Sequence, residues 1–229
     1  MDGTQTEPDF AALERILAER YSCRAFRPDP VPDDTIARIV RAAGRAPSWC
    51  NAQPWQVTVT RGAETDRFRA ALLATAESTA PASDLPWPES YPGVYGARRR
   101  TCGFQLYEAV GIARDDRAAR KEQSMQNYRL FDAPHVAIVH SEAALGPYGA
   151  MDTGGFVTAF TLAATALGVA TIAQASVAAF PGFIRAHFGL PETRMILCAV
   201  SFGYADPDHP ANAFRTERAD VADIMDTRG

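Results

Sequence analysis

The stretch RYSCRAFRPDPVPDDTIARIVRAAGRAPSWCNAQPWQV, residues 20–57, combines three patterns that together predict how this part of the chain folds. It opens with alternating polar residues, which suit an extended segment. Residues 33–44 then place Ile36 and Ile39 on one face of an amphipathic helix. Gly44 and Pro47 end that helix, so the unusual decapeptide APSWCNAQPW starts at a helix C-terminus.

The composition indicates an ordinary globular protein. The chain has 229 residues, 47% of them hydrophobic and 22% charged, and we expect a single domain over residues 1–229. A net charge of -4 argues against a nucleic-acid partner. The start MDGTQTEPDF lacks the features of a secretion signal. The four cysteines are widely spaced, so we expect reduced thiols, a cytoplasmic location and no metal site.

The uncharged run FVTAFTLAATALGVATIA, residues 156–173, is long enough to span a membrane. Its threonines and alanines, and the helix-ending Gly168, are more typical of a buried helix followed by a buried strand. We therefore expect no membrane association.

The remaining patterns predict helices separated by short strands. Helices are expected over 8–20, 64–78, 98–113 and 116–129 and in PGFIRAHFG, and strands in WQVTVTRG, APHVAIVH, VATIAQA and MILCAVSFGY. This order indicates an α+β or α/β protein with one sheet covered by helices. The proline-rich residues 80–100 predict an ordered loop over a site, because prolines exclude regular helix and three large aromatics argue against disorder.

The alternating run RYSCRAF is a candidate anion site. Arg20, Ser22 and Arg24 lie on one side of an extended segment, and two guanidinium groups with a hydroxyl suit a phosphate. A solvated basic edge explains the same pattern equally well. The chain has no G-x-G-x-x-G, P-loop, H-E-x-x-H or G-x-S-x-G motif, which disfavours the commonest nucleotide, zinc and serine-hydrolase sites.

Read together, the R-x-S-x-R-x-F run, the PV turn, the helix and the P-S-x-x-N-x-Q-P-W motif resemble the start of the FMN-dependent nitroreductase family. YRLFDAPHVAIV, MDTGGFVTAFTLAATALG, IAQAS and FRTER resemble later family landmarks in the same order, so the resemblance covers nearly the whole chain. It implies an α+β nitroreductase-like fold with a central mixed sheet flanked by helices. It also implies an intertwined homodimer with two FMN molecules at the subunit interface.

The resemblance also implies a set of flavin contacts. The implied cofactor-binding residues are Arg20, Ser22, Arg24, Pro47, Ser48, Trp49, Asn51, Arg129, Gln174, Ala175, Arg215 and Arg218. The RYSCRAF and FRTER residues are implied at the phosphate and the polar edge of the flavin, with Arg215 the weaker candidate. The PSWCN residues are implied to reach the partner's flavin, and backbone N–H groups of IAQAS to face flavin N5.

Arg129 is implied near the pyrimidine end of the flavin, where a cation would stabilise negative charge that develops on reduction. A helix-end charge is the other explanation for this arginine. Gln126 or Asn127 could bond the same ring edge instead. For Trp55 we expect a core anchor instead of a ligand contact.

The activity that the resemblance implies is NAD(P)H-dependent reduction of nitroaromatic or related acceptors, by ping-pong two-electron transfer from NADPH or NADH. Flavin carries this chemistry, so no acid or base side chain is assigned. A flavin-dependent dehydrogenase, dehalogenase or flavin reductase of the same fold remains an alternative, as does a non-catalytic flavin-binding protein.

Residues 79–128 are implied to form an insertion that covers the substrate channel. Its candidate contacts for a flat aromatic acceptor are Trp87, Tyr91, Tyr95 and Arg99. If one of the arginines at 98–100 turns inward, it would favour a carboxylated nitroarene. Three solvated charges at the start of a helix are the alternative.

Overall fold

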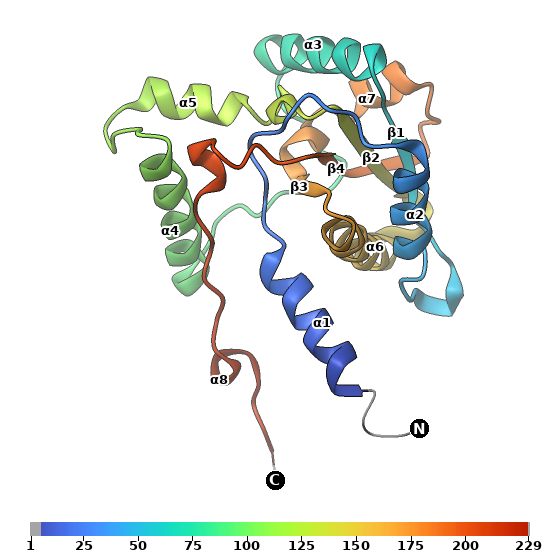
Figure 1. Ribbon diagram of the computed structural model, residues 1–229. Coiled ribbons are helices and arrows are strands. Elements are labelled where there is room, and N and C mark those ends of the chain that lie inside the picture. The colour runs from blue at the N-terminus through green and yellow to red at the C-terminus, as the bar shows by residue number, and fades with distance from the viewer. Residues whose placement is uncertain (1–5, 229) are drawn as a thin grey trace.

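A four-stranded sheet lies at the centre of the computed structural model, which describes residues 6–228 (Figure 1). The strands are β1 (Gln56–Val59), β2 (His135–Glu142), β3 (Ala170–Gln174) and β4 (Arg194–Gly203). The helices are α1 (Thr6–Glu19), α2 (Asp33–Ala43), α3 (Ala63–Ser78), α4 (Gly93–Ala109), α5 (Arg117–Met125), α6 (Gly146–Ala166), α7 (Pro181–Phe188) and α8 (Val221–Ile224). Residues 1–5, at the start of the segment that lacks signal features, lie outside the described residues.

The sheet has the order β1-β2-β4-β3, and each neighbouring pair of strands is antiparallel. A bulge between Val139 and His140 interrupts the register of β2 against β4. Among the described residues, parallel pairing is confined to an isolated bridge between Ser22 and Thr171, which ties the RYSCRAF segment to β3. The α+β class is therefore confirmed, with the four described strands antiparallel throughout and the parallel bridge outside them.

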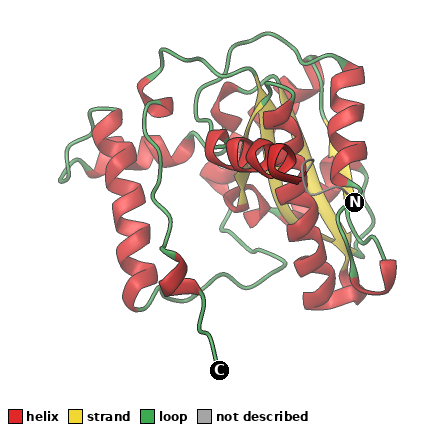
Figure 2. Cartoon of the chain, turned by 60° about the horizontal axis from the view of Figure 1, so that its bottom comes forward, coloured by secondary structure: helices red, strands yellow, loops and turns green. Residues whose placement is uncertain are grey.

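Helices cover both faces of the sheet (Figure 2). On one face, α2 and α6 bury Ile39, Phe156 and Phe160 against β2 and β4. On the other face, α3 and α7 bury Phe68 and Ile184. Each face therefore has its own apolar cluster, as expected for a sheet with an amphipathic helix layer on either side.

Trp55 belongs to the first of these clusters. Its ring stacks on Phe156 with 5.5 Å between ring centroids. The prediction that Trp55 is a core anchor is confirmed.

The uncharged run 156–173 divides as predicted into a helix and a strand. Helix α6 ends at Ala166, the chain turns through Gly168 at φ 72°, and β3 begins at Ala170. That φ favours glycine, because a side chain would strain the turn. Within residues 6–228, no helix combines the length and apolar character needed to cross a membrane.

The proline-rich segment differs from its prediction. Residues 80–92 are irregular, but α4 begins at Gly93, so Tyr95 and the arginines at 98–100 are helical. Treating the whole stretch as a loop was wrong, because its last proline is Pro92 and nothing beyond it prevents a helix. The irregular part is well tied down, since the Asp84 carboxylate accepts from the backbone N–H of Ile196 at 2.8 Å and pairs with Arg185.

Candidate functional site

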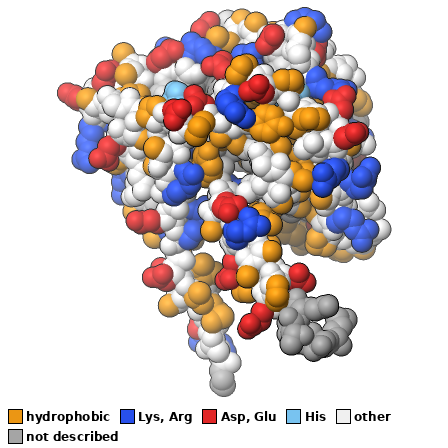
Figure 3. Space-filling view, in the orientation of Figure 1, with side chains coloured by type: hydrophobic (Ala, Val, Ile, Leu, Met, Phe, Trp, Pro, Cys, Tyr) orange, Lys and Arg blue, Asp and Glu red, His pale blue; other side chains and the backbone are white. Residues whose placement is uncertain are grey.

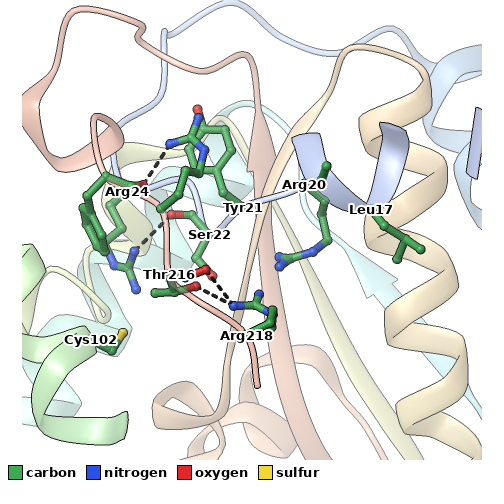
Figure 4. Close-up of a pocket in the computed structure, with 11 residues that line it drawn as sticks. Leu17, Arg20, Tyr21, Ser22, Arg24, Cys102, Thr216 and Arg218 are labelled. Carbon is green, nitrogen blue, oxygen red and sulfur yellow. Dashed lines mark hydrogen bonds between the residues drawn. The ribbon is translucent and has the colours of Figure 1, made fainter. Parts of the chain in front are cut away.

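A cavity of about 270 Å³ forms where the RYSCRAF segment meets the C-terminal tail. Figure 4 shows the side chains of Arg20, Arg24 and Arg218 gathered around it. The described residues that line it are Leu17, Ala18, Arg20, Tyr21, Ser22, Arg24, Cys102, Phe214, Arg215, Thr216 and Arg218. Four of these are arginines and none is acidic, so the cavity is built for an anion.

The electrostatics of this cavity support that conclusion. Burial lowers the pKa of Arg24. Burial and the nearby charge of Arg218 lower the pKa of Arg20. The hydrogen bonds that Arg24, Arg215 and Arg218 make all go to neutral oxygen atoms. Arg20 and Arg24 are partly buried, and keeping such like-charged groups without a counter-charge is unfavourable in free energy. A bound anion would remove that penalty.

The tail that completes the cavity is held by Asn212. Its buried amide accepts from the backbone N–H of Arg24 at 2.8 Å and donates to the carbonyl of Ala25 at 2.9 Å. Arg215 stacks on Tyr21, with 3.7 Å from its guanidinium carbon to the ring centroid. Asn212 was not predicted from the sequence, because a lone asparagine between two alanines carries no periodic signal.

A second cavity, of about 280 Å³, lies next to the first, and Ser22 and Arg24 line both. Its walls include Gln174 and Ala175 at the end of β3, Asn127, and residues of α4 and α5. The side chain of Gln174 is fully engaged, because it donates to the Asn127 carbonyl at 2.8 Å and accepts from Ser201 at 2.5 Å. Side-chain hydrogen bonding by Gln174 is therefore directed into the protein.

Ser176 supplies an orphaned polar atom at the second cavity. Its Oγ is buried and has no hydrogen-bond partner within the described structure, although the residue lines the cavity. A buried hydroxyl without a partner is unfavourable unless a ligand satisfies it. The two cavities thus offer a cationic end and a neutral polar end to one elongated ligand.

Comparison with known proteins decides the family. The model of the nitroreductase family matches residues 17–204. This chain belongs to the nitroreductase family. It is 37% identical to the nitroreductase NfnB of Mycolicibacterium smegmatis, over 93% of this chain and 91% of that protein. It is 32% identical to a 4-nitrobenzoate reductase of Pseudomonas putida, over 90% of this chain and 91% of that one.

Solved structures agree with this assignment. The crystal structure of the FMN-dependent nitroreductase NfnB from Mycobacterium smegmatis, in complex with NADPH, superimposes with a TM-score of 0.91 at 36% identity. It covers 96% of this chain and 99% of its own. The nitroreductase fold expected from the resemblance is therefore confirmed.

Five of the residues expected at the flavin phosphate and polar edge meet in this nitroreductase at the first cavity. Arg20, Ser22, Arg24, Arg215 and Arg218 all line it, although they come from opposite ends of the chain. The geometry thus favours the anion-site interpretation of the alternating run over a solvated basic edge. Their contact with a ligand remains a prediction.

Arg129 does not join the walls of the two cavities. Its Nη1 pairs with Glu122 at 2.6 Å. Asn127 lines the second cavity instead, and Gln126 lines a third, of about 290 Å³, which Arg24 also lines. The geometry favours Asn127 among the three alternatives at this position, because Asn127 lines the second cavity and the guanidinium of Arg129 pairs with Glu122.

The decapeptide lies away from both cavities of its own chain. Pro47, Ser48, Trp49 and Asn51 form the turn beyond α2, drawn in light blue in Figure 1. Trp49 is 58% exposed, and its backbone N–H donates to the Asp152 carboxylate at 3.0 Å.

The aromatic candidates for substrate contact also lie outside these cavities. Trp87, Tyr91 and Tyr95 are about half exposed, and the guanidinium of Arg99 lies over the Tyr91 ring at 5.2 Å. The arginines at 98–100 are exposed on α4. Their role in substrate binding stays a prediction.

Proposed function

We propose that this nitroreductase family member binds FMN, uses NADPH or NADH as electron donor, and reduces nitroaromatic compounds as a homodimer. One observation carries the proposal: four arginines and no carboxylate line a cavity that is joined, through Ser22 and Arg24, to a second polar cavity. The similarity to an FMN-dependent nitroreductase with bound NADPH supports it.

The residues present fit FMN better than FAD. Arg20, Arg24 and Arg218 would hold a single terminal phosphate, with Arg215 beside them. The orphaned hydroxyl of Ser176 would face the ring system. When bound, FMN supplies the two-electron chemistry, and the protein contributes orientation and electrostatics. Asn127 and the backbone N–H groups of Gln174 and Ala175 would provide hydrogen bonds at the ring.

The nitroaromatic substrate class rests on the relatives. Two of them are 4-nitrobenzoate reductases and one is a nitrobenzene nitroreductase. A carboxylated nitroarene would suit the cationic first turns of α4, where arginines at 98–100 are exposed and Arg99 lies over the Tyr91 ring. A flavin-dependent activity on another metabolite is the alternative within the same fold.

The homodimer is supported by apolar side chains that the chain leaves uncovered. Phe10, Leu13 and Leu17 form an exposed stripe on α1, and Val221 and Ile224 are exposed on α8. Both elements project from the same end of the molecule, and Figure 3 shows hydrophobic side chains on both projections. Exposed apolar surface of this extent marks an interface, and a second copy would cover it.

The same copy would explain the decapeptide. Trp49 packs edge-on against Tyr148, with 4.4 Å between ring centroids, and both rings are more than half exposed. We infer that Trp49 and Asn51 complete the partner's flavin site. We also infer one domain, with residues 79–128 covering the channel, and a cytoplasmic location, which the four free cysteines support.

The decisive experiment is to identify the chromophore and its reduction. Purified protein should be yellow and release FMN on denaturation, as measured by mass spectrometry. Anaerobic NADPH or NADH should bleach the colour, and a nitroarene should restore it. Initial-rate lines for donor and acceptor should be parallel, as ping-pong kinetics require. Bound FAD, a colourless protein or a flavin that neither nucleotide reduces would overturn the proposal.

A further inference from the structure

A strained turn lies behind the two cavities. Leu130, Phe131 and Asp132 are consecutive and have φ angles of 57°, 51° and 58°. These values lie in the left-handed region, which side chains make unfavourable. Residues persist in such conformations when their surroundings hold them there, most often at functional sites.

Arg69 on α3 holds this turn from outside. Its Nε donates to the carbonyl of Arg129 at 3.0 Å, and its Nη2 donates to the carbonyl of Ala133 at 2.6 Å. These two carbonyls flank the three left-handed residues. Its Nη1 pairs with Asp66 at 2.6 Å, and the side chain is 20% exposed. A planar guanidinium can bridge two carbonyls in this way, whereas a single ammonium cannot hold the same geometry.

The same left-handed turn supports the ligand cavities. Phe131 is 4% exposed and packs with Cys23, which lies between Ser22 and Arg24, and with Phe26 at the end of the same segment. Phe131 also lines both the second and the third cavity. A shift of this ring would therefore move the backbone that carries Ser22 and Arg24.

We propose that Arg69 is a positioning residue for the flavin site: it clamps the left-handed turn at 130–132 and thereby fixes Phe131 under the phosphate-binding segment. The inference rests on the proposed function only in taking FMN as the ligand of the two cavities. Arg69 touches neither cavity and acts through the turn.

The test compares Arg69→Met with Arg67→Met. Arg67 lies on the same helix and makes an i,i+3 ion pair with Glu64, as Arg69 does with Asp66, but it is 65% exposed. FMN dissociation constants are measured by fluorescence quenching on apoprotein. Arg69→Met should raise the constant about tenfold, the effect of losing one charged hydrogen bond, and Arg67→Met should leave it unchanged.

Three further variants separate the clamp from general stabilisation. Asp66→Asn removes the ion pair but keeps both carbonyl contacts, so FMN affinity should stay at the wild-type value. Arg69→Lys should give an intermediate constant, and it keeps the test available if Arg69→Met does not fold. Asp132→Gly relieves one left-handed residue, because glycine adopts this conformation without strain. In the Asp132→Gly background, Arg69→Met should therefore raise the FMN dissociation constant by only about half as much, on a logarithmic scale, as it does in the wild type.

The outcomes are distinct. Weaker FMN binding in Arg69→Met and Arg69→Lys, with recovery by Asp132→Gly, supports the clamp. Wild-type FMN affinity in both Arg69 variants, with only a lower apoprotein melting temperature, would overturn it. A wild-type protein that binds no FMN would instead refute the proposed function.

Discussion

The cationic cavity and the decapeptide turn differ in how much of their environment one chain supplies. One chain supplies all the walls of the cationic cavity: Arg24 is partly buried there, and Asn212 holds the tail across it by hydrogen bonds. The decapeptide turn is incomplete, because Trp49 and Tyr148 pack on each other but remain more than half exposed. Exposed aromatic surface of this kind is typical of an interface, and the proposed homodimer would cover it. The difference is the one expected if, as proposed above, each flavin site takes its phosphate end from one subunit and the decapeptide from the other.

Replacing the central cation should have the largest effect. Arg24 lines all three of the neighbouring cavities, and its loss should weaken FMN binding by about 3 kcal/mol or more, the upper range for charged hydrogen bonds. We expect Arg24→Ala to purify as a folded, largely colourless protein, and flavin titration of the apoprotein checks this. Retention of tightly bound FMN would show that the cationic cavity is not the phosphate site.

Low pH should destabilise the second of the two regions, where the decapeptide leads into β1. His140 pairs in register with Gln56 of β1 and is buried, and burial together with Arg194 lowers its pKa to about 4. Between about pH 6.5 and about pH 4 the unfolded chain binds a proton at His140 that the folded protein does not. The free energy of unfolding should therefore fall by up to about 3 kcal/mol as the pH is lowered through this range. Urea unfolding of the wild type and of His140→Phe measures this. Identical pH slopes would show that His140 does not carry the linkage.

A smaller loss is expected at the tail. Arg218 is more exposed than Arg24 and bonds to Thr216 within its own segment. Arg218→Ala should weaken FMN binding by about 1.5–3 kcal/mol, with the dimer intact. An unchanged FMN dissociation constant, measured as for Arg24→Ala, would mean that the tail closes over something other than the phosphate.

The smallest expected effect concerns the decapeptide itself. Trp49→Ala should lower kcat/KM about fivefold, which corresponds to about 1 kcal/mol of transition-state stabilisation, the scale of one aromatic contact. Mixing Trp49→Ala with Arg24→Ala subunits is the sharper measurement, because each heterodimer would contain one site with both native residues. Activity should rise above that of either variant alone after subunit exchange. No gain despite mass-spectrometric proof of exchange would mean that Trp49 and Arg24 of the same subunit serve one site, or that Trp49 serves no site.

Local sequence patterns were enough for the four strands and most of the helices, and for the helix-glycine-strand at 156–173. Such patterns report period and turn chemistry, which are local properties. The start of α4 at Gly93 was missed, because proline-rich sequence before it extended the predicted loop too far. Arg20 and Arg24 could be paired from their spacing alone, since both lie on one short extended segment.

The sequence by itself determined the family, the two faces of the sheet and the identity of the cationic residues. Only the tertiary structure decided that Arg218 meets Arg20 across one cavity, that Asn212 holds the tail there, and that Arg129 pairs with Glu122. The clamp of Arg69 on the turn at 130–132 also came only from the fold. These contacts join residues far apart in the chain or depend on a left-handed backbone, and neither leaves a periodic trace in the sequence.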